Sequence, residues 1–223
     1  MACFEDKCLS RNNPEFEGSC DYVDFRFGKK WCKSWKSIWA DSEDKTKGYI
    51  EMIHKRYPNS IASEYVREVG YPDTFYIEDF KVIDTIMRRR KQFKKPDKST
   101  LVIHLRLGDV LSPYYGNVYA YDYDYYKELL TKVLRNKKIK KIDIVTGLHK
   151  NVFVKKSNQY LHKIVQLFKE HYPVKVVITK NPDKDFYYMT HSSYFASSGG
   201  GFSRLISEYL YTKRKKVYEN ENI

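Results

Sequence analysis

The chain lacks any long apolar run. A membrane-spanning helix needs about 20 consecutive, mostly apolar residues, and no such stretch occurs among the 223 residues. The start, Met1 to Lys7, shows no basic segment followed by an apolar one, which is the pattern of a secretory signal peptide. We therefore expect a soluble cytoplasmic protein without a membrane span. The many lysines and tyrosines are typical of an AT-rich genome, such as that of a large virus acting in a host cytoplasm.

The chain also lacks the two C-x2–4-C pairs that are typical of zinc sites. Its 4 cysteines, Cys3, Cys8, Cys20 and Cys32, all lie near the start. Free thiols are favoured, ahead of one or two disulfides and of structural zinc. No internal repeat, low-complexity tract, G-x-x-x-x-G-K-[ST] or G-x-G-x-x-G motif is present.

Positive charge is in excess: 41 Lys and Arg stand against 28 Asp and Glu, a net charge of +13. Such an excess favours an anionic partner, for example a nucleotide, nucleic acid or a charged glycan. The charge gathers in short clusters at 88–91, 94–95, 137–141 and 213–216. We favour a solvated basic surface over a dedicated nucleic-acid groove.

Beyond a polar, proline-containing break at 93–99, strand and helix patterns alternate. The predicted strands are 100–106, 140–146, 174–179 and 193–196. The predicted helices are 124–136, 157–171, 185–190 and 202–213. This order predicts an α/β fold with a parallel, doubly wound, Rossmann-type sheet and right-handed crossovers.

The first half reads as a smaller, helix-rich lobe. A strand is predicted at 22–27, and helices at 30–39, 43–56, 60–69 and 78–92. The chain then has two domains: an N-terminal lobe, 1–99, and a sheet domain, 100–223.

The most informative segment is Leu101 to Asp109, which reads as a strand ending in a turn. Alternate residues of a strand share a face, so His104 and Arg106 point one way and Ile103, Leu105 and Leu107 the other. Arginine suits phosphate recognition, and the carboxyl ends of strands are where open α/β sheets bind ligands. The alternative is an edge strand with a solvated polar face.

A second site is predicted where Gly199, Gly200 and Gly201 separate a strand from a helix. Glycines permit close approach of a ligand to the backbone, and a helix start presents unpaired N–H groups, so the turn suits a phosphate. Ser203 is expected to cap the helix, and Arg204 to add charge. The alternative is a flexible turn. Two phosphate contacts at one sheet edge favour a nucleoside diphosphate.

The segment His104-x-Arg106-x-Gly108-Asp109 resembles the H-x-R-x-G-D signature of the α-1,2-fucosyltransferases and their wider superfamily. Later segments in the same order are similar to the other motifs of that family, over about residues 100–212. They are Asp124–Lys127, Ile144–Gly147, Asp185–Thr190 and Ser197–Ser203.

The resemblance implies a two-lobed GT-B glycosyltransferase that is inverting and needs no metal or cofactor. Arg106 would hold the donor pyrophosphate, and Asp185 would help hold the nucleoside. The remaining donor-binding residues implied by the match are Thr146, Ser198, Gly199, Gly200, Gly201, Phe202 and Ser203. The donor would be GDP-fucose or a UDP-sugar such as UDP-xylose, because the glycine-rich turn departs from the family's N-S-T-F-S type. The acceptor would be an oligosaccharide or a glycoprotein, and a homodimer is possible.

An inverting transfer also needs a group that takes the acceptor proton. The candidates are His104, Asp73 and His54, although an Asp after a proline is often only a turn residue. Asp109 is expected to bond loop amides.

Two rival interpretations remain open. Asp122-x-Asp124 and Asp183-x-Asp185 fit a D-x-D manganese motif, but both precede predicted helices and we favour helix capping. A non-catalytic nucleic-acid-binding module ranks second as a function.

Overall fold

The computed structural model describes residues 55, 58–69, 80–112, 120–149, 153–179 and 181–220. The described residues belong to two compact units, which meet in the sequence between Phe93 and Lys94, at the start of the polar segment 93–99. The later unit holds the sheet. None of the described helices is long and apolar enough to cross a membrane.

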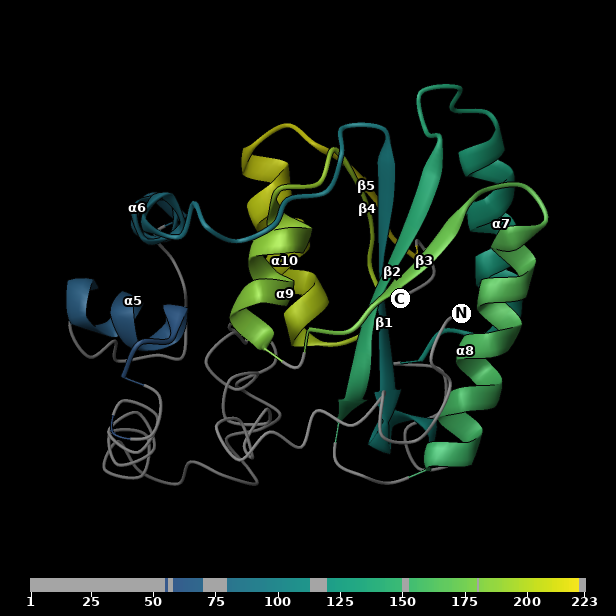
Figure 1. The fold of residues 1–223 in the computed structure, drawn as a ribbon, viewed down its shortest axis with the longest axis horizontal. Helices are drawn as coiled ribbons and strands as arrows, with labels where there is room; N and C mark the ends of the chain where they lie inside the picture. Colours follow the sequence, from purple (N-terminus) through teal and green to yellow (C-terminus); the bar gives the residue numbers. More distant parts are fainter. Residues whose placement is uncertain are drawn as a thin grey trace. The chain divides into compact units, whose positions relative to one another are not determined.

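The sheet has five parallel strands in the order β3-β2-β1-β4-β5 (Figure 1). The strands are β1 (Thr100–Gly108), β2 (Lys141–His149), β3 (Val174–Val177), β4 (Tyr194–Ala196) and β5 (Lys216–Tyr218). They alternate with α7 (Tyr123–Leu134), α8 (Val154–Lys169), α9 (Pro182–Thr190) and α10 (Gly201–Thr212). A short 3-10 helix, η2 (Asp109–Leu111), follows β1. The predicted parallel α/β sheet is confirmed, and its layout is Rossmann-like.

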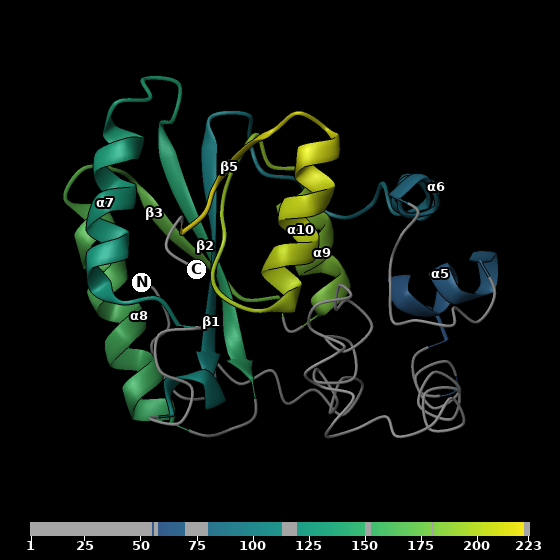
Figure 2. The same cartoon turned by 180° about the vertical axis from the view of Figure 1, so that it is seen from behind.

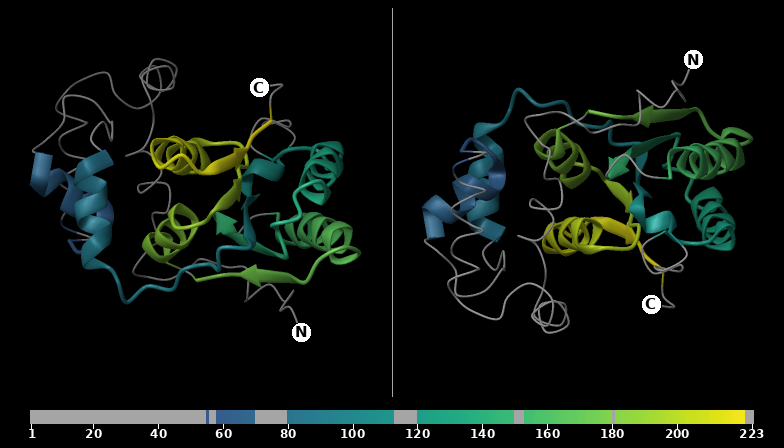
Figure 3. Two further views of the ribbon diagram at one scale, coloured as in Figure 1. Left: turned by 90° about the horizontal axis from the view of Figure 1, so that it is seen from above. Right: turned by 90° about the horizontal axis from the view of Figure 1, so that it is seen from below.

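The two faces of β1 are covered by different helices. α7 and α8 lie on one face of the sheet, and α9 and α10 lie on the other (Figures 2 and 3). Leu101, Ile103, Leu105 and Leu107 are buried in one cluster with apolar residues of α7 and α8. His104 points to the opposite face, where its ring meets that of Phe202 in α10. The predicted alternation along β1 is therefore confirmed.

The strand order creates a topological switch point beside β1. The chain steps outward from β1 to β2 and β3, then returns to the other side of β1 with β4. Crossovers to the two sides use helices on opposite faces, so the switch point lies between the carboxyl ends of β1 and β4. In such sheets this is the position at which ligands bind.

The predicted elements of the sheet domain are confirmed, with bounds that shift by a few residues. Strand β5 was not predicted, because it is three residues long and continues the basic run that starts at Lys213. In its pairing with β4, Val217 lies opposite Phe195. This pairing gives the backbone N–H and C=O groups of β5 hydrogen-bond partners that the short strand would lack by itself.

The described part of the earlier unit contains α5 (Ile61–Val69) and α6 (Phe80–Arg89), which confirm the helices predicted at 60–69 and 78–92. The predicted strand at 22–27 and helix at 30–39 lie outside the described residues. So do the four cysteines and, apart from Lys55, the helix predicted at 43–56.

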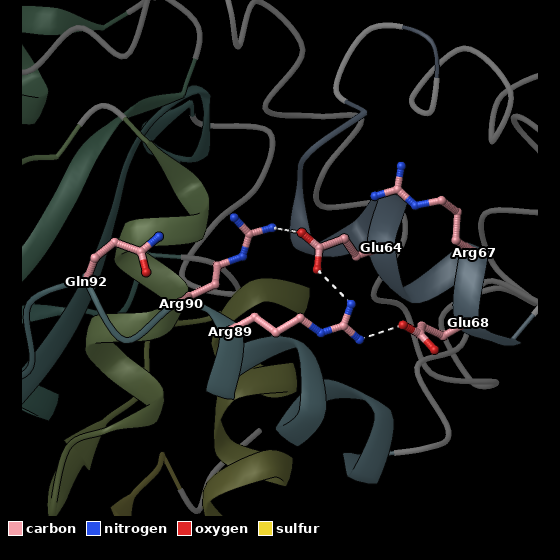
Figure 4. Close-up of a pocket in the computed structure, with 6 residues that line it drawn as sticks. All are labelled: Glu64, Arg67, Glu68, Arg89, Arg90 and Gln92. Carbon is pink, nitrogen blue, oxygen red and sulfur yellow. Dashed lines mark hydrogen bonds and ion pairs between the residues drawn. The ribbon is translucent and has the colours of Figure 1, made fainter.

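Ion pairs join α5 to the end of α6 (Figure 4). Arg90 donates to the Glu64 carboxylate and, at 2.6 Å, to the carbonyl of Asn59. Arg89 donates to Glu68 at 2.5 Å. Together with Arg67 and Gln92 these side chains line a small pocket. The Arg90–Glu64 pair is the better protected one, since its side chains are 13% and 17% exposed against 50% and 44% for Arg89 and Glu68.

We expect Glu64→Gln to destabilise this helical pair by about 1–3 kcal/mol, because a largely buried guanidinium loses its charged partner. The matched variant Glu68→Gln is expected to leave stability unchanged, because an exposed pair is screened by solvent. Hydrogen exchange at the backbone amides of α5 and α6 measures both. Equal protection in the two variants would contradict the assignment of Glu64.

Buried tyrosines are expected to make the sheet unit sensitive to alkali. Burial raises the pKa of Tyr125, Tyr126, Tyr160 and Tyr188, and Tyr126 is fully buried. Because the folded pKa is raised, stability is complete below the unfolded tyrosine pKa of about 10 and is lost as pH rises above it. We expect the free energy of unfolding in urea to fall steeply between about pH 10 and 11.

Tyr126→Phe keeps the ring and removes one titrating group. It is expected to reduce that fall by about 1 kcal/mol between about pH 10 and 11, because the unfolded tyrosine is only partly ionised near its own pKa. An unchanged slope in this variant would show that other groups carry the alkaline sensitivity.

Candidate functional site

A buried histidine links the central strand to the glycine turn. His104 of β1 is 4% exposed, and its Nδ1 lies 2.7 Å from the Ser203 hydroxyl and 3.0 Å from the Ser198 hydroxyl. The Ser203 oxygen also accepts the Ser198 backbone N–H at 2.9 Å. The Ser203 oxygen therefore bonds both the turn backbone and the His104 ring, and the tautomer of the ring decides which atom donates in the contacts to Nδ1.

The pairing of β1 with β4 explains this contact. Ile103 lies opposite Ala196 in the parallel register, so His104 is level with the start of the turn. Phe202 packs edge-on against the His104 ring, with centroids 5.4 Å apart, and stacks on Phe186 of α9 at 6.2 Å. The first turn of α10 is thereby fixed on the face of β1 that carries His104.

The start of α10 differs from the prediction. Gly200 is the N-cap residue and provides no side-chain cap, so the prediction that Ser203 caps the helix is wrong. The Ser203 hydroxyl is directed to His104 and Ser198 instead. The φ angle of 99° at Gly200 explains the need for glycine there. An N-terminus without a side-chain cap leaves backbone N–H groups of the kind that bind anions.

Arg106 lies two residues beyond His104 on the same face of β1. Its Nη2 is 3.6 Å from Asp109 Oδ1, and the two side chains are 20% and 18% exposed. The strand ends at Gly108, whose φ of 89° requires glycine and whose N–H is bonded to Ser157 Oγ at 3.1 Å. Asp109 thus faces a guanidinium, and its role in bonding loop amides stays a prediction.

Thr146 and Asp185 are both engaged within the fold. The Thr146 hydroxyl is buried in β2 and donates to the Leu105 carbonyl at 2.6 Å. Asp185, on α9, is fully buried and accepts the Thr179 hydroxyl at 2.7 Å. The Thr146 bond supports the backbone of β1, and the Asp185 bond supports the segment that leads into α9.

The two D-x-D segments differ in their local roles. Asp122 caps α7 by accepting the Tyr125 N–H at 2.9 Å, as predicted, while Asp124 pairs with Lys127. The cap of α9 is Asn181, so the capping role predicted for Asp183 and Asp185 is wrong. Within the described ranges, no group of three or more acidic, histidine or cysteine side chains is arranged to hold a metal ion.

Three further residues were predicted to act at the site: Asp73, His54 and Arg204. Asp73 and His54, the two candidates from the first half, fall outside the described residues. Arg204 directs its Nε to Glu208, one turn further along α10, at 2.9 Å. Its charge is therefore already balanced by a neighbouring carboxylate.

Two hydrogen bonds near the site were not predicted. The Tyr125 hydroxyl donates to the Ser197 carbonyl at 3.3 Å, which links α7 to the end of β4. Ser157 of α8 binds the N–H of Gly108. The segment Asp124–Lys127 contains Tyr125, but nothing local to it indicates a partner 72 residues away.

Ser203 and Ser207 form a matched pair on successive turns of α10, each 1% exposed. We expect Ser203→Ala to cost about 1–3 kcal/mol, because the Ser198 N–H and His104 Nδ1 lose a shared partner. Ser207→Ala is expected to be neutral or stabilising, because no hydrogen bond to the Ser207 hydroxyl occurs within the described structure. Urea unfolding of both variants compares them, and an equal loss would contradict the network.

No protein-family model matches the chain, and a search of curated proteins finds no match to it.

Proposed function

We propose that the protein is an inverting, metal-independent glycosyltransferase of the GT-B type. It would transfer a sugar from a nucleoside diphosphate donor, GDP-fucose or a UDP-sugar such as UDP-xylose, to a hydroxyl of an oligosaccharide or glycoprotein. The observation that carries this proposal is the placement of Arg106 and the start of α10 at the carboxyl ends of neighbouring strands, beside the switch point of the sheet. A guanidinium and a helix N-terminus are both suited to phosphate.

The His104 network supports the same proposal. It fixes Ser198 and the first turn of α10 to the strand that carries Arg106, so the cation and the N-terminus are held on one rigid frame. Preorganised charge is the contribution that a site must make when a diphosphate leaves. A flexible glycine turn, the alternative considered above, would not require a buried histidine bonded to two serines.

In the proposed reaction the acceptor oxygen attacks the anomeric carbon as the bond to the leaving phosphate oxygen breaks. Arg106 and the backbone N–H groups at the start of α10 stabilise the charge that develops on the diphosphate. The acceptor hydroxyl gives its proton to a base, for which His104, Asp73 and His54 are the candidates. His104 already uses Nδ1 to hold the turn, which favours a positioning role for it.

We assign the other donor residues according to their contacts. Ser198, Gly199, Gly200, Gly201, Phe202 and Ser203 form the phosphate turn. Thr146 supports the β1 backbone through Leu105. Asp185 would act on the nucleoside side by holding Thr179 and the entry to α9.

Calorimetric titration of GDP and of UDP, each with a chelator and with Mn²⁺, tests the proposal. We expect one nucleotide to bind in the presence of chelator, and the matching nucleotide sugar to be consumed when glycan acceptors are supplied. Binding that requires Mn²⁺ would contradict metal independence. Absence of binding by folded protein under all four conditions would contradict the nucleotide site itself.

A further inference from the structure

The end of the sheet opposite the candidate site is strongly basic. The segments that precede β1, β2 and β5 lie together at the top of Figure 1, at the amino ends of the strands. We call this the amino-edge surface and define it by the connections 94–99, 135–140, 170–173, 191–193 and 213–215. These connections hold ten lysines and arginines against two carboxylates, Asp97 and Glu170. The basic residues are Lys94, Lys95, Lys98, Arg135, Lys137, Lys138, Lys140, Lys213, Arg214 and Lys215.

All ten of these side chains are exposed. They come from three connections that are far apart in the sequence and are brought together by the parallel sheet, since every parallel strand begins at the same edge. Lys141, the first residue of β2, and Lys175, the second residue of β3, add to the surface. The charge is thus concentrated by the fold, although the sequence shows only separate short clusters.

A pocket of about 240 Å³ opens on this surface. Lys94, Lys95, Lys141 and Lys175 contribute to its lining, together with Asp143 and Tyr188. Its two carboxylates are already engaged: Asp97 pairs with Lys141, and buried Asp143 accepts the Tyr188 hydroxyl. Lys95 lies over the Tyr187 ring at 5.6 Å. Within the described structure, Lys94, Lys95 and Lys175 make no ion pair, so the pocket has an excess of positive charge.

We propose that the amino-edge surface docks the protein on an anionic lipid membrane, with a headgroup phosphate in the pocket. Charge complementarity carries the proposal, and each lysine near such a surface contributes on the order of a fivefold increase in binding. Eight of the ten defining residues are lysines, which are hydrated point charges without the planar fork of arginine. Mobile headgroups can adapt to scattered lysines, whereas nucleic acid presents phosphates at a fixed spacing. These features favour lipid over nucleic acid.

Docking at this edge would leave the opposite, carboxyl edge of the sheet facing the solution. The nucleotide site proposed above lies at that edge, so a soluble donor could reach it in the docked state. The lipid proposal nevertheless rests on the basic surface alone and does not require the proposed transfer activity.

Flotation of the full chain with vesicles tests the proposal. We expect binding to vesicles of equimolar phosphatidylcholine and phosphatidylserine, none to pure phosphatidylcholine, and weaker binding as salt is raised. The triple variant Lys138→Glu, Lys175→Glu, Lys215→Glu reverses the charge of one lysine at the amino end of each of β2, β3 and β5. We expect this variant to lose about a hundredfold or more in affinity.

The control is Lys155→Glu, Lys163→Glu, Lys184→Glu, which makes the same change of net charge at exposed positions on α8 and α9. It should bind the anionic vesicles within about threefold of the original chain. An equal loss in both triple variants would overturn the proposal, because net charge alone would then explain binding. Nucleotide titration and circular dichroism of the first variant report separately on the carboxyl-edge site and on folding.

Two further outcomes would also overturn it. One is binding of an RNA or DNA oligonucleotide, lost in the first variant, without binding to vesicles. The other is saturable binding of inorganic phosphate or glycerophosphoserine, again without vesicle binding, which would make the pocket a site for a soluble phosphate.

Discussion

Arg106→Ala is expected to weaken the binding of a nucleoside diphosphate by at least about a hundredfold. Charge-assisted hydrogen bonds to phosphate contribute roughly 1.5–3 kcal/mol each, and a guanidinium can make two of them. The side chain lies near the end of β1, 20% exposed, with Asp109 at 3.6 Å. Calorimetry with whichever of GDP and UDP binds the original chain measures the loss directly.

Two further variants separate charge from geometry. Arg106→Lys keeps the charge and loses the planar fork, so we expect an intermediate loss of about tenfold. Arg204→Ala is the matched control, because this arginine is near the same helix start but is 53% exposed and already bonded to Glu208. We expect its affinity to stay within about twofold. A loss in Arg204→Ala as large as that in Arg106→Ala would indicate a general effect of positive charge.

Phe202→Ala is expected to lower the free energy of unfolding by about 3–5 kcal/mol, the usual cost of removing a buried phenyl ring. The ring is 7% exposed and packs between the His104 imidazole and Phe186. It fixes the first turn of α10 to both β1 and α9. Because that turn carries the proposed phosphate contacts, nucleotide affinity should fall in the same variant, even at temperatures where it remains folded.

Phe153→Ala provides the control for this prediction. Phe153 is the same residue type but is 45% exposed, so its removal should change stability by less than about 0.5 kcal/mol and leave nucleotide binding unaltered. Urea unfolding and calorimetry on both variants give the comparison. A cost below about 1 kcal/mol for Phe202→Ala would show that α10 is held by other contacts.

Local patterns in the sequence were sufficient to predict most of the sheet domain. The alternation along residues 101–107 predicted one apolar face and one face with His104 and Arg106, and β1 has that form. A helix was likewise predicted at 157–171, and α8 lies there with Leu161, Ile164 and Phe168 buried. These predictions succeed because burying one face of a strand repeats apolar residues at every second position, whereas burying one side of a helix repeats them at every third or fourth.

Contacts between distant segments could not be read in this way. Ser203 was predicted to cap α10, a local role, but its hydroxyl bonds His104, 99 residues earlier. Asp185 was predicted to cap or to bind a ligand, and it accepts the Thr179 hydroxyl. A polar side chain has several possible partners of equal chemistry, and only the tertiary arrangement decides which one it reaches.

The sequence by itself determined the alternating strands and helices, the polar face of β1 and the glycine turn before α10. The tertiary structure decided that β4 lies beside β1, which brings His104 to the serines of that turn and Arg106 to the same edge. It also decided that separate basic clusters share the amino edge of the sheet. The reason is physical: periodicity along the chain reflects local burial, whereas strand order depends on which distant segments pair, and pairing is a property of the whole fold.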